Sequence, residues 1–222
     1  MTQPAGPDLS KCCAAAALTR PARQVHLAVL VAFTVARQPP SRDDLERIAR
    51  AHGGDPGEAL AELATADVIA FGADGEIRAA YPFSPVPTPI QVRWAGGPLT
   101  YAMCAIDALG MSAMLGHPVT ITAAEPGTGR IITVHADHDQ ARWNPRGAIV
   151  FAGATGDEGC PSADRACGYI NFFTSARAAR AWVRRHPEVT GTVMSRQGAL
   201  HCSIAEFGTL MQAAQPAGPP PR

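Results

Sequence analysis

The chain has 222 residues, 19 basic and 19 acidic side chains that give a formal net charge of zero, and a hydrophobic share of 46%. This length suits one large domain or two small ones, and the hydrophobic share is enough to form a buried core. The balanced charge argues against a protein held to nucleic acid or anionic lipid by a basic excess. It also argues against a disordered chain, which needs low hydrophobicity and high net charge.

The longest apolar run, residues 25–35, is too short for a transmembrane helix, and residues 1–8 lack the pattern of a signal peptide. We therefore expect a cytoplasmic protein with no membrane contact. Cysteines in a reducing compartment are usually free thiols. The six cysteines are thus candidate ligands or nucleophiles, and none of their spacings is the Cys-x-x-Cys of a zinc ribbon.

Composition divides the chain into five stretches. Residues 1–20 and 213–222 are rich in Pro, Gly and Ala, which predicts a flexible leader and a disordered tail. A proline-rich linker, residues 84–89, separates an N-terminal unit, residues 21–83, from a second unit, residues 90–212.

The N-terminal unit has the pattern of three helices followed by a hairpin. A buried helix is expected over residues 25–37, and Ser41 and Asp55 are typical N-caps of two further helices. Two β-prone runs follow, at residues 68–71 and 77–81. This order predicts a winged-helix-like domain.

A winged helix often binds DNA through its third helix, but that helix is acidic here. Residues 55–66 contain Asp55, Glu58 and Glu62 and no basic residue. Phosphate repels such a helix. We therefore expect a structural role and no contact with nucleic acid.

The second unit predicts an α+β fold, a mostly antiparallel sheet with surrounding helices. Strands are expected at residues 90–94, 119–123, 131–135, 148–151, 168–173 and 192–195, and helices at residues 99–115, 175–186 and 200–211.

The first of these helices carries the pair Cys104 and Asp107. Residues three apart share a helix face, so the two side chains can meet. Cys104 lies near the helix start, where the dipole favours a thiolate. Asp107 has apolar neighbours, and burial there would raise its pKa and let it donate a proton. A core cysteine and a structural aspartate are the alternatives for this pair.

A second thiol, Cys167, enters the β-prone run that ends in Phe172 and Phe173. Two thiols and a carboxylate, with no histidine nearby in sequence, do not suit a cysteine hydrolase, which needs a base. They better suit a soft, thiophilic metal.

These segments resemble the alkylmercury (organomercurial) lyase family. The family's Tyr-Ala-x-Cys-Ala-x-Asp-x-Leu helix matches residues 101–109, and its downstream Cys, Phe-Phe strand and Ala-rich helix with a Trp match residues 167–182. The resemblance runs over about residues 20–210 and includes a winged-helix-like region that does not read DNA. Met103 departs from a position that is often aromatic, and no third cysteine lies between Cys104 and Cys160.

The resemblance implies that Cys104 and Cys167 bind the mercury of R–Hg⁺, with Asp107 also at the metal. Asp107 would take a thiol proton and return it to the departing carbon, which gives R–H and leaves Hg(II) on the cysteines. No cofactor is implied. Exogenous thiol, or a mercuric reductase as partner, would remove the ion.

Two other functions stay open at this point. The chain could be a thiol-based metal sensor whose winged helix contacts DNA, or a relative that acts on another organometal or a biosynthetic substrate. The remaining cysteines carry less information. Cys12 and Cys13 could carry mercury but lie in the leader, Cys160 could collect metal in a loop, and Cys202 is expected in the core.

Overall fold

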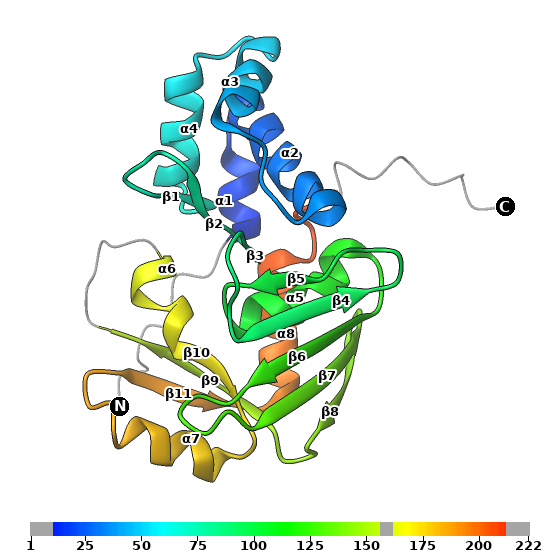
Figure 1. Ribbon diagram of the computed structural model, residues 1–222, viewed down its shortest axis with the longest axis vertical. Helices are drawn as coiled ribbons and strands as arrows, with labels where there is room; N and C mark the ends of the chain where they lie inside the picture. Colours follow the sequence, from blue (N-terminus) through cyan, green and yellow to red (C-terminus); the bar gives the residue numbers. More distant parts are fainter. Residues whose placement is uncertain (1–10, 156–161, 212–222) are drawn as a thin grey trace, which may run out of the picture.

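The computed structural model describes residues 11–155 and 162–211, and Figure 1 shows their arrangement. The helices are α1 (Lys11–Ala17), α2 (Arg20–Ala36), α3 (Arg42–Ala51), α4 (Pro56–Thr65), α5 (Ala105–Leu115), α6 (Ser162–Arg165), α7 (Ala176–Val183) and α8 (Arg196–Phe207), with a 3₁₀ turn η1 (Cys167–Tyr169). The strands are β1 (Ile69–Phe71), β2 (Ile77–Ala80), β3 (Phe83–Ser84), β4 (Ile90–Trp94), β5 (Thr100–Ala102), β6 (Val119–Ala124), β7 (Ile131–Asp137), β8 (Gln140–Asn144), β9 (Ile149–Ala154), β10 (Ile170–Phe173) and β11 (Thr190–Met194).

Helices α3 and α4 begin where side chains can cap them. The Ser41 hydroxyl accepts from the backbone N–H of Asp44 at 3.2 Å, and the Asp55 carboxylate accepts from that of Glu58 at 3.0 Å. Each bond satisfies one of the free N–H groups at a helix start, which is why α3 and α4 begin at the expected residues. The antiparallel hairpin of β1 and β2 follows α4.

That hairpin is part of a larger sheet. The order of the eight strands is β1-β2-β3-β5-β4-β6-β7-β8, and all neighbouring pairs are antiparallel. A second sheet has the order β10-β9-β11, also antiparallel. The expected α+β fold with a mostly antiparallel sheet is therefore confirmed. Because β3 pairs with β5, the large sheet runs across the linker expected at residues 84–89, and that domain division stays a prediction.

Helices α5 and α8 lie side by side, and α5 also contacts strands β4 to β7 of the large sheet. Every residue of α5 except Ala113 and Leu115 is buried. Gly110 makes the close approach possible, because a Cβ at this position would lie 2.7 Å from both the Phe207 ring and the Ser203 carbonyl oxygen. The core of the protein thus surrounds the helix that carries Cys104 and Asp107.

Three expectations about local structure need correction. The helix expected over residues 99–115 begins only at Ala105, because residues 100–102 are strand β5 and pair with β4 and β3. Strand β8 was not expected from the sequence. Residues 11–17 of the expected flexible leader form helix α1, whose Lys11 is buried at 5% exposure because it has polar partners in the folded chain. Within the described residues, no helix is long and apolar enough to span a bilayer.

Candidate functional site

Strand β5 leads directly into the first two residues of the site. Cys104 is the N-cap of α5, with an extended backbone, and its Sγ accepts from the backbone N–H of Asp107 at 3.5 Å. Asp107 is the third residue of the helix, so its side chain leaves the helix close to the cap. The Cys104 and Asp107 side chains therefore lie close together because of the local geometry of the helix start.

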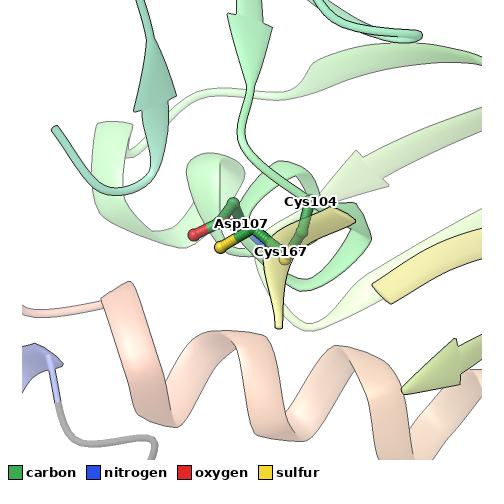
Figure 2. A group of neighbouring side chains, drawn as sticks. All are labelled: Cys104, Asp107 and Cys167. Atoms are coloured by element: carbon green, nitrogen blue, oxygen red, sulfur yellow. Dashed lines mark hydrogen bonds between the residues drawn. The ribbon is translucent and has the colours of Figure 1, made fainter. Parts of the chain in front are cut away.

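Cys167 comes from a different part of the fold. It opens the turn η1, which precedes strand β10 of the second sheet. The structure brings all three predicted residues together, and one ligand atom from each lies within 4.8 Å of the other two. Figure 2 shows the three side chains converging from these segments. It is the one such group of three or more Cys, His, Asp or Glu found within residues 11–155 and 162–211.

The three side chains are out of contact with bulk water. Cys104 and Asp107 are each 3% exposed and Cys167 is 6% exposed. The cavity that they share has a free volume of about 20 Å³, which is room for about one water molecule. Organic groups larger than this need a movement of the surrounding residues to enter.

Burial decides the proton affinities in this pocket. It raises the pKa of Asp107 from the usual 3.8 to about 7, and Oδ2 of this carboxyl has no hydrogen-bond partner among the described residues. Burial also raises the pKa of the Cys104 thiol well above its usual value, and the neighbouring Cys167 and Asp107 raise it further. The expectation that the helix start would favour a Cys104 thiolate is therefore wrong, because the loss of water raises the pKa of this thiol more than the dipole lowers it.

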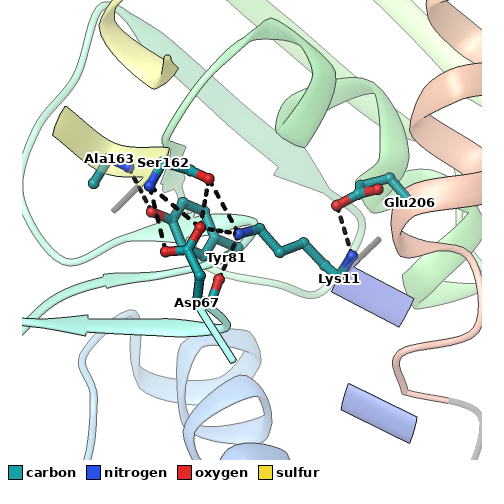
Figure 3. Close-up of polar contacts among 6 residues, drawn as sticks. All are labelled: Lys11, Asp67, Tyr81, Ser162, Ala163 and Glu206. Carbon is teal, nitrogen blue, oxygen red and sulfur yellow. Dashed lines mark hydrogen bonds and ion pairs between the residues drawn. The ribbon is translucent and has the colours of Figure 1, made fainter. Parts of the chain in front are cut away.

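A polar network covers the pocket, and sequence reasoning missed its members. The Lys11 ammonium donates to Asp67 Oδ2 at 2.6 Å and to Ser162 Oγ at 3.3 Å, and lies 4.1 Å from the centroid of the Tyr81 ring. The Lys11 backbone N–H donates to Glu206 Oε1 at 2.8 Å. Figure 3 shows Lys11 reaching across from α1 to these groups.

Lys11, Tyr81, Ser162 and Glu206 all line the same cavity as the three site residues. The sequence holds one signal for this network, since Lys11 is the only lysine in a chain whose other cations are arginines. Its partners lie far away along the chain, so no local pattern points to them.

The other cysteines lie apart from this group. Cys12 is half-buried and Cys13 is exposed, both on α1. Cys202 on α8 is half-buried and packs against the core, and burial followed by the nearby Glu206 raises the pKa of its thiol. Cys160 lies outside the described residues.

Comparison with known proteins gives the family. The family model described as MerB, alkylmercury lyase, matches residues 83–208. The alkylmercury lyase of Staphylococcus epidermidis is 30% identical over 144 residues, which cover 65% of this chain and 66% of the relative. The alkylmercury lyase of Bacillus cereus is 30% identical over 132 residues, which cover 60% and 59%. These matches thus span slightly less than two thirds of each relative's own length.

A solved structure agrees in fold. The mercury-bound form of MerB2 superimposes with a TM-score of 0.72 at 23% identity, over 90% of this chain and 96% of that one. This likeness supports the α+β architecture described above. Because the family model covers more than half of the sequence, including the segments that carry Cys104, Asp107 and Cys167, the chain belongs to the alkylmercury lyase family.

Proposed function

We propose that this protein is an organomercurial lyase, which cleaves the carbon–mercury bond of R–Hg⁺ by protonolysis and gives R–H and Hg(II). The observation that carries the proposal is the buried convergence of two thiols and one carboxyl, with ligand atoms within 4.8 Å of one another. Thiolates are the ligands that a soft metal prefers, and a carboxyl with a raised pKa is a proton donor at neutral pH.

The two cysteines take the metal in this proposal. When R–Hg–SR′ enters, the thiols of Cys104 and Cys167 replace the small thiol on mercury. The balanced reaction is R–Hg–SR′ plus two cysteine thiols giving mercury bound to two cysteine sulfurs, R–H and R′SH. One thiol proton thus leaves with the small thiol, and the other is transferred to carbon.

Asp107 moves the second proton. With a pKa of about 7 the Asp107 carboxyl is partly ionised at neutral pH, and metal binding makes a thiol strongly acidic, so the carboxylate can accept the thiol proton as the mercury–sulfur bond forms. The protonated carboxyl then lies beside the metal-bound carbon and can return the proton to it. Exclusion of water favours this transfer, because no solvent competes for the proton.

We also propose which cofactors, partners and substrates the reaction uses. We propose no resident cofactor, since thiols and a carboxyl supply the chemistry, and Hg(II) is the product. Small-molecule thiols, or a mercuric reductase as partner, would remove the ion in the cytoplasm. Alkyl and aryl mercurials are both within the substrate class.

We further propose that residues 21–83 form a winged-helix-like unit with a structural role, followed by the linker 84–89 and a catalytic domain, residues 90–212. On α4, the Glu62 carboxylate accepts from the backbone N–H of Thr19 at 2.7 Å and from its hydroxyl at 2.6 Å. This acidic side chain thus holds the start of α2. The third helix of this unit, α4, is acidic and its Glu62 carboxylate is bonded within the fold, which argues against a DNA-binding sensor.

The test is incubation of the reduced protein with phenylmercuric acetate and excess small-molecule thiol, with benzene measured by gas chromatography. We expect several turnovers of benzene per chain. A variant that carries both Cys104→Ser and Cys167→Ser is the control and should release none above the rate without protein. Mercury uptake by the reduced protein without release of benzene would overturn the proposal.

A further inference from the structure

A second cavity lies where α1 and α2 meet the chain that follows α8. Its volume is about 220 Å³, and its lining includes Cys12 from α1, Arg23 and His26 from α2, and Thr209 from the chain that follows α8. It is distinct from the pocket of Cys104, Asp107 and Cys167, with which it shares no lining residue. A volume of this size can hold a metal ion together with part of a small ligand.

Cys12 has polar neighbours in this cavity. Its Sγ accepts a hydrogen bond from the Thr209 hydroxyl at 3.0 Å. The Arg23 guanidinium also lines the cavity, and its Nη2 donates to the Leu18 carbonyl at 2.8 Å. The Cys12 sulfur thus lies in a cavity that also contains a hydroxyl donor and a guanidinium group.

The second feature of this cavity is a buried imidazole. His26 is 1% exposed, and its Nε2 has no hydrogen-bond partner among residues 11–155 and 162–211. Burial lowers the pKa of His26 to about 4, so the ring is neutral at physiological pH. A neutral imidazole is a metal ligand, and a buried polar atom without a partner destabilises the fold. Because Nε2 has almost no accessible surface, a ligand in the cavity would give this nitrogen a partner only after a rotation of the ring.

We propose that Cys12 and His26 form a second binding site for a soft metal ion, and that it takes Hg(II) as a complex with small thiols. The exchange is RS–Hg–SR plus the Cys12 thiol giving Cys12–S–Hg–SR and RSH. The Cys12 proton leaves with the displaced thiol, and His26 Nε2 adds as a further ligand. Sulfur with nitrogen is a donor set that suits soft and borderline metals.

The position of the site suggests its use, and this step rests on the proposed lyase activity. Lys11 lines the catalytic pocket, and the next residue, Cys12, lines this cavity. Helix α1 therefore contributes to both sites. An ion released from Cys104 and Cys167 would meet Cys12 as an acceptor next to the site of release.

The experiment isolates this site from the other thiols. A chain with serine at positions 104, 160, 167 and 202 keeps only Cys12 and Cys13. It is given Hg(II) in excess glutathione, desalted, and analysed for bound mercury. We expect one mercury per chain, retained in competition with glutathione. Adding Cys12→Ser should abolish this retention, because it removes the only sulfur ligand of the proposed site.

Cys13→Ser is the matched control, because Cys13 neighbours Cys12 but is exposed. It should leave retention unchanged. Equal retention after Cys12→Ser, or loss after Cys13→Ser alone, would overturn the proposal.

A second measurement uses the unmodified chain and does not depend on the folding of these variants. With ¹⁵N-labelled histidine, Hg(II) added beyond the first equivalent should shift the Nε2 resonance of His26, which His26→Leu assigns. An unshifted His26 resonance at two bound equivalents would rule out the imidazole ligand. Neither assay uses a compound with a carbon–mercury bond. Failure of both assays would therefore not contradict the lyase proposal, and a lack of benzene release would not contradict the second metal site.

Discussion

The thiol of Cys104 and the backbone amide of Asp107 are joined by a hydrogen bond, with 3.5 Å between Sγ and N. This contact makes Cys104 the N-cap of α5 and puts Asp107 in its first turn. One local interaction thus starts the helix and places a thiol beside a carboxyl. Figure 2 shows that Cys167 completes the group from another segment.

We expect Cys104→Ser and Cys167→Ser each to abolish turnover of phenylmercuric acetate, because the proposed cleavage needs both sulfurs on one mercury. Serine keeps the size but offers a hard oxygen that binds mercury poorly. Benzene release under excess thiol is the measurement. Cys202→Ser is the control, since this thiol packs against the core on α8 and should affect stability alone. Multiple turnovers in Cys167→Ser would contradict the two-thiolate mechanism.

Asp107→Asn should separate metal binding from cleavage. Asparagine keeps the shape of the side chain but neither accepts nor returns the proton. The variant should still take up one equivalent of phenylmercury, whereas benzene release should fall by about 10²–10⁴-fold, the usual worth of general acid–base help. Loss of uptake together with cleavage would show that the carboxyl is a ligand or a fold determinant.

The raised pKa of Asp107 also predicts how stability depends on pH. The unfolded chain ionises this carboxyl near pH 3.8 and the folded chain near 7, so its ionisation increasingly favours unfolding as pH rises between these values. Relative to the wild type, Asp107→Asn should therefore gain stability from about pH 4 to about pH 7. The rise from 3.8 to about 7 corresponds to at most on the order of 4 kcal/mol.

Urea unfolding of the metal-free protein at a series of pH values measures this difference. Asp139→Asn, at an exposed position, is the matched control. A constant gap between Asp107→Asn and the wild type over this range would mean that the carboxyl is ionised in the folded protein throughout.

Lys11→Met should destabilise the protein through loss of the network over the pocket. The substitution removes the hydrogen bonds that the ammonium donates to Asp67 and Ser162, while the direct bonds from Ser162 to Asp67 remain (Figure 3). Hydrogen bonds to charged groups are worth about 1.5–3 kcal/mol, so we expect a loss of about 2 kcal/mol in urea unfolding. Arg78→Gln is the comparison, because it breaks an exposed ion pair with Asp164 and exposed pairs contribute about 0–1 kcal/mol. Equal effects of the two substitutions would contradict a special role for Lys11.

Gly110→Ala should destabilise the contact between α5 and α8. The added methyl would lie 2.7 Å from the Ser203 carbonyl oxygen, a backbone atom that has little freedom to move. Overpacking of this kind costs about 1–3 kcal/mol. Gly168→Ala is the control, since nothing lies within 4 Å of a Cβ there. Thermal unfolding of both variants tests the difference, and an unchanged midpoint in Gly110→Ala would show that the helices can separate without loss.

Features that depend on neighbours in the chain were predictable from the sequence. Ser41 and Asp55 cap helices as their side chains suggested, and strand β4 occupies the expected residues 90–94. A cap needs only a side-chain oxygen and an amide two or three residues away. The burial of Asp107 was also expected, because its neighbours along the helix are apolar.

Features that depend on distant segments were decided by the tertiary structure. The start of α5 moved to Ala105 because residues 100–102 find strand partners in β4 and β3. Helix α1, expected to be part of a loose leader, is fixed by Asp67 and Glu206, which no pattern in the leader announces.

The sequence by itself thus determined the residue types of the site and the pairing of Cys104 with Asp107, because hydrogen bonds within one helix turn specify that pair. The resemblance implied that Cys167 would join them, but only the tertiary structure brings it there, places α1 over them, and raises the pKa of the Cys104 thiol through burial. The physical reason is that burial and long-range contacts, which set both proximity and pKa, arise when the whole core packs and are not encoded in any one segment.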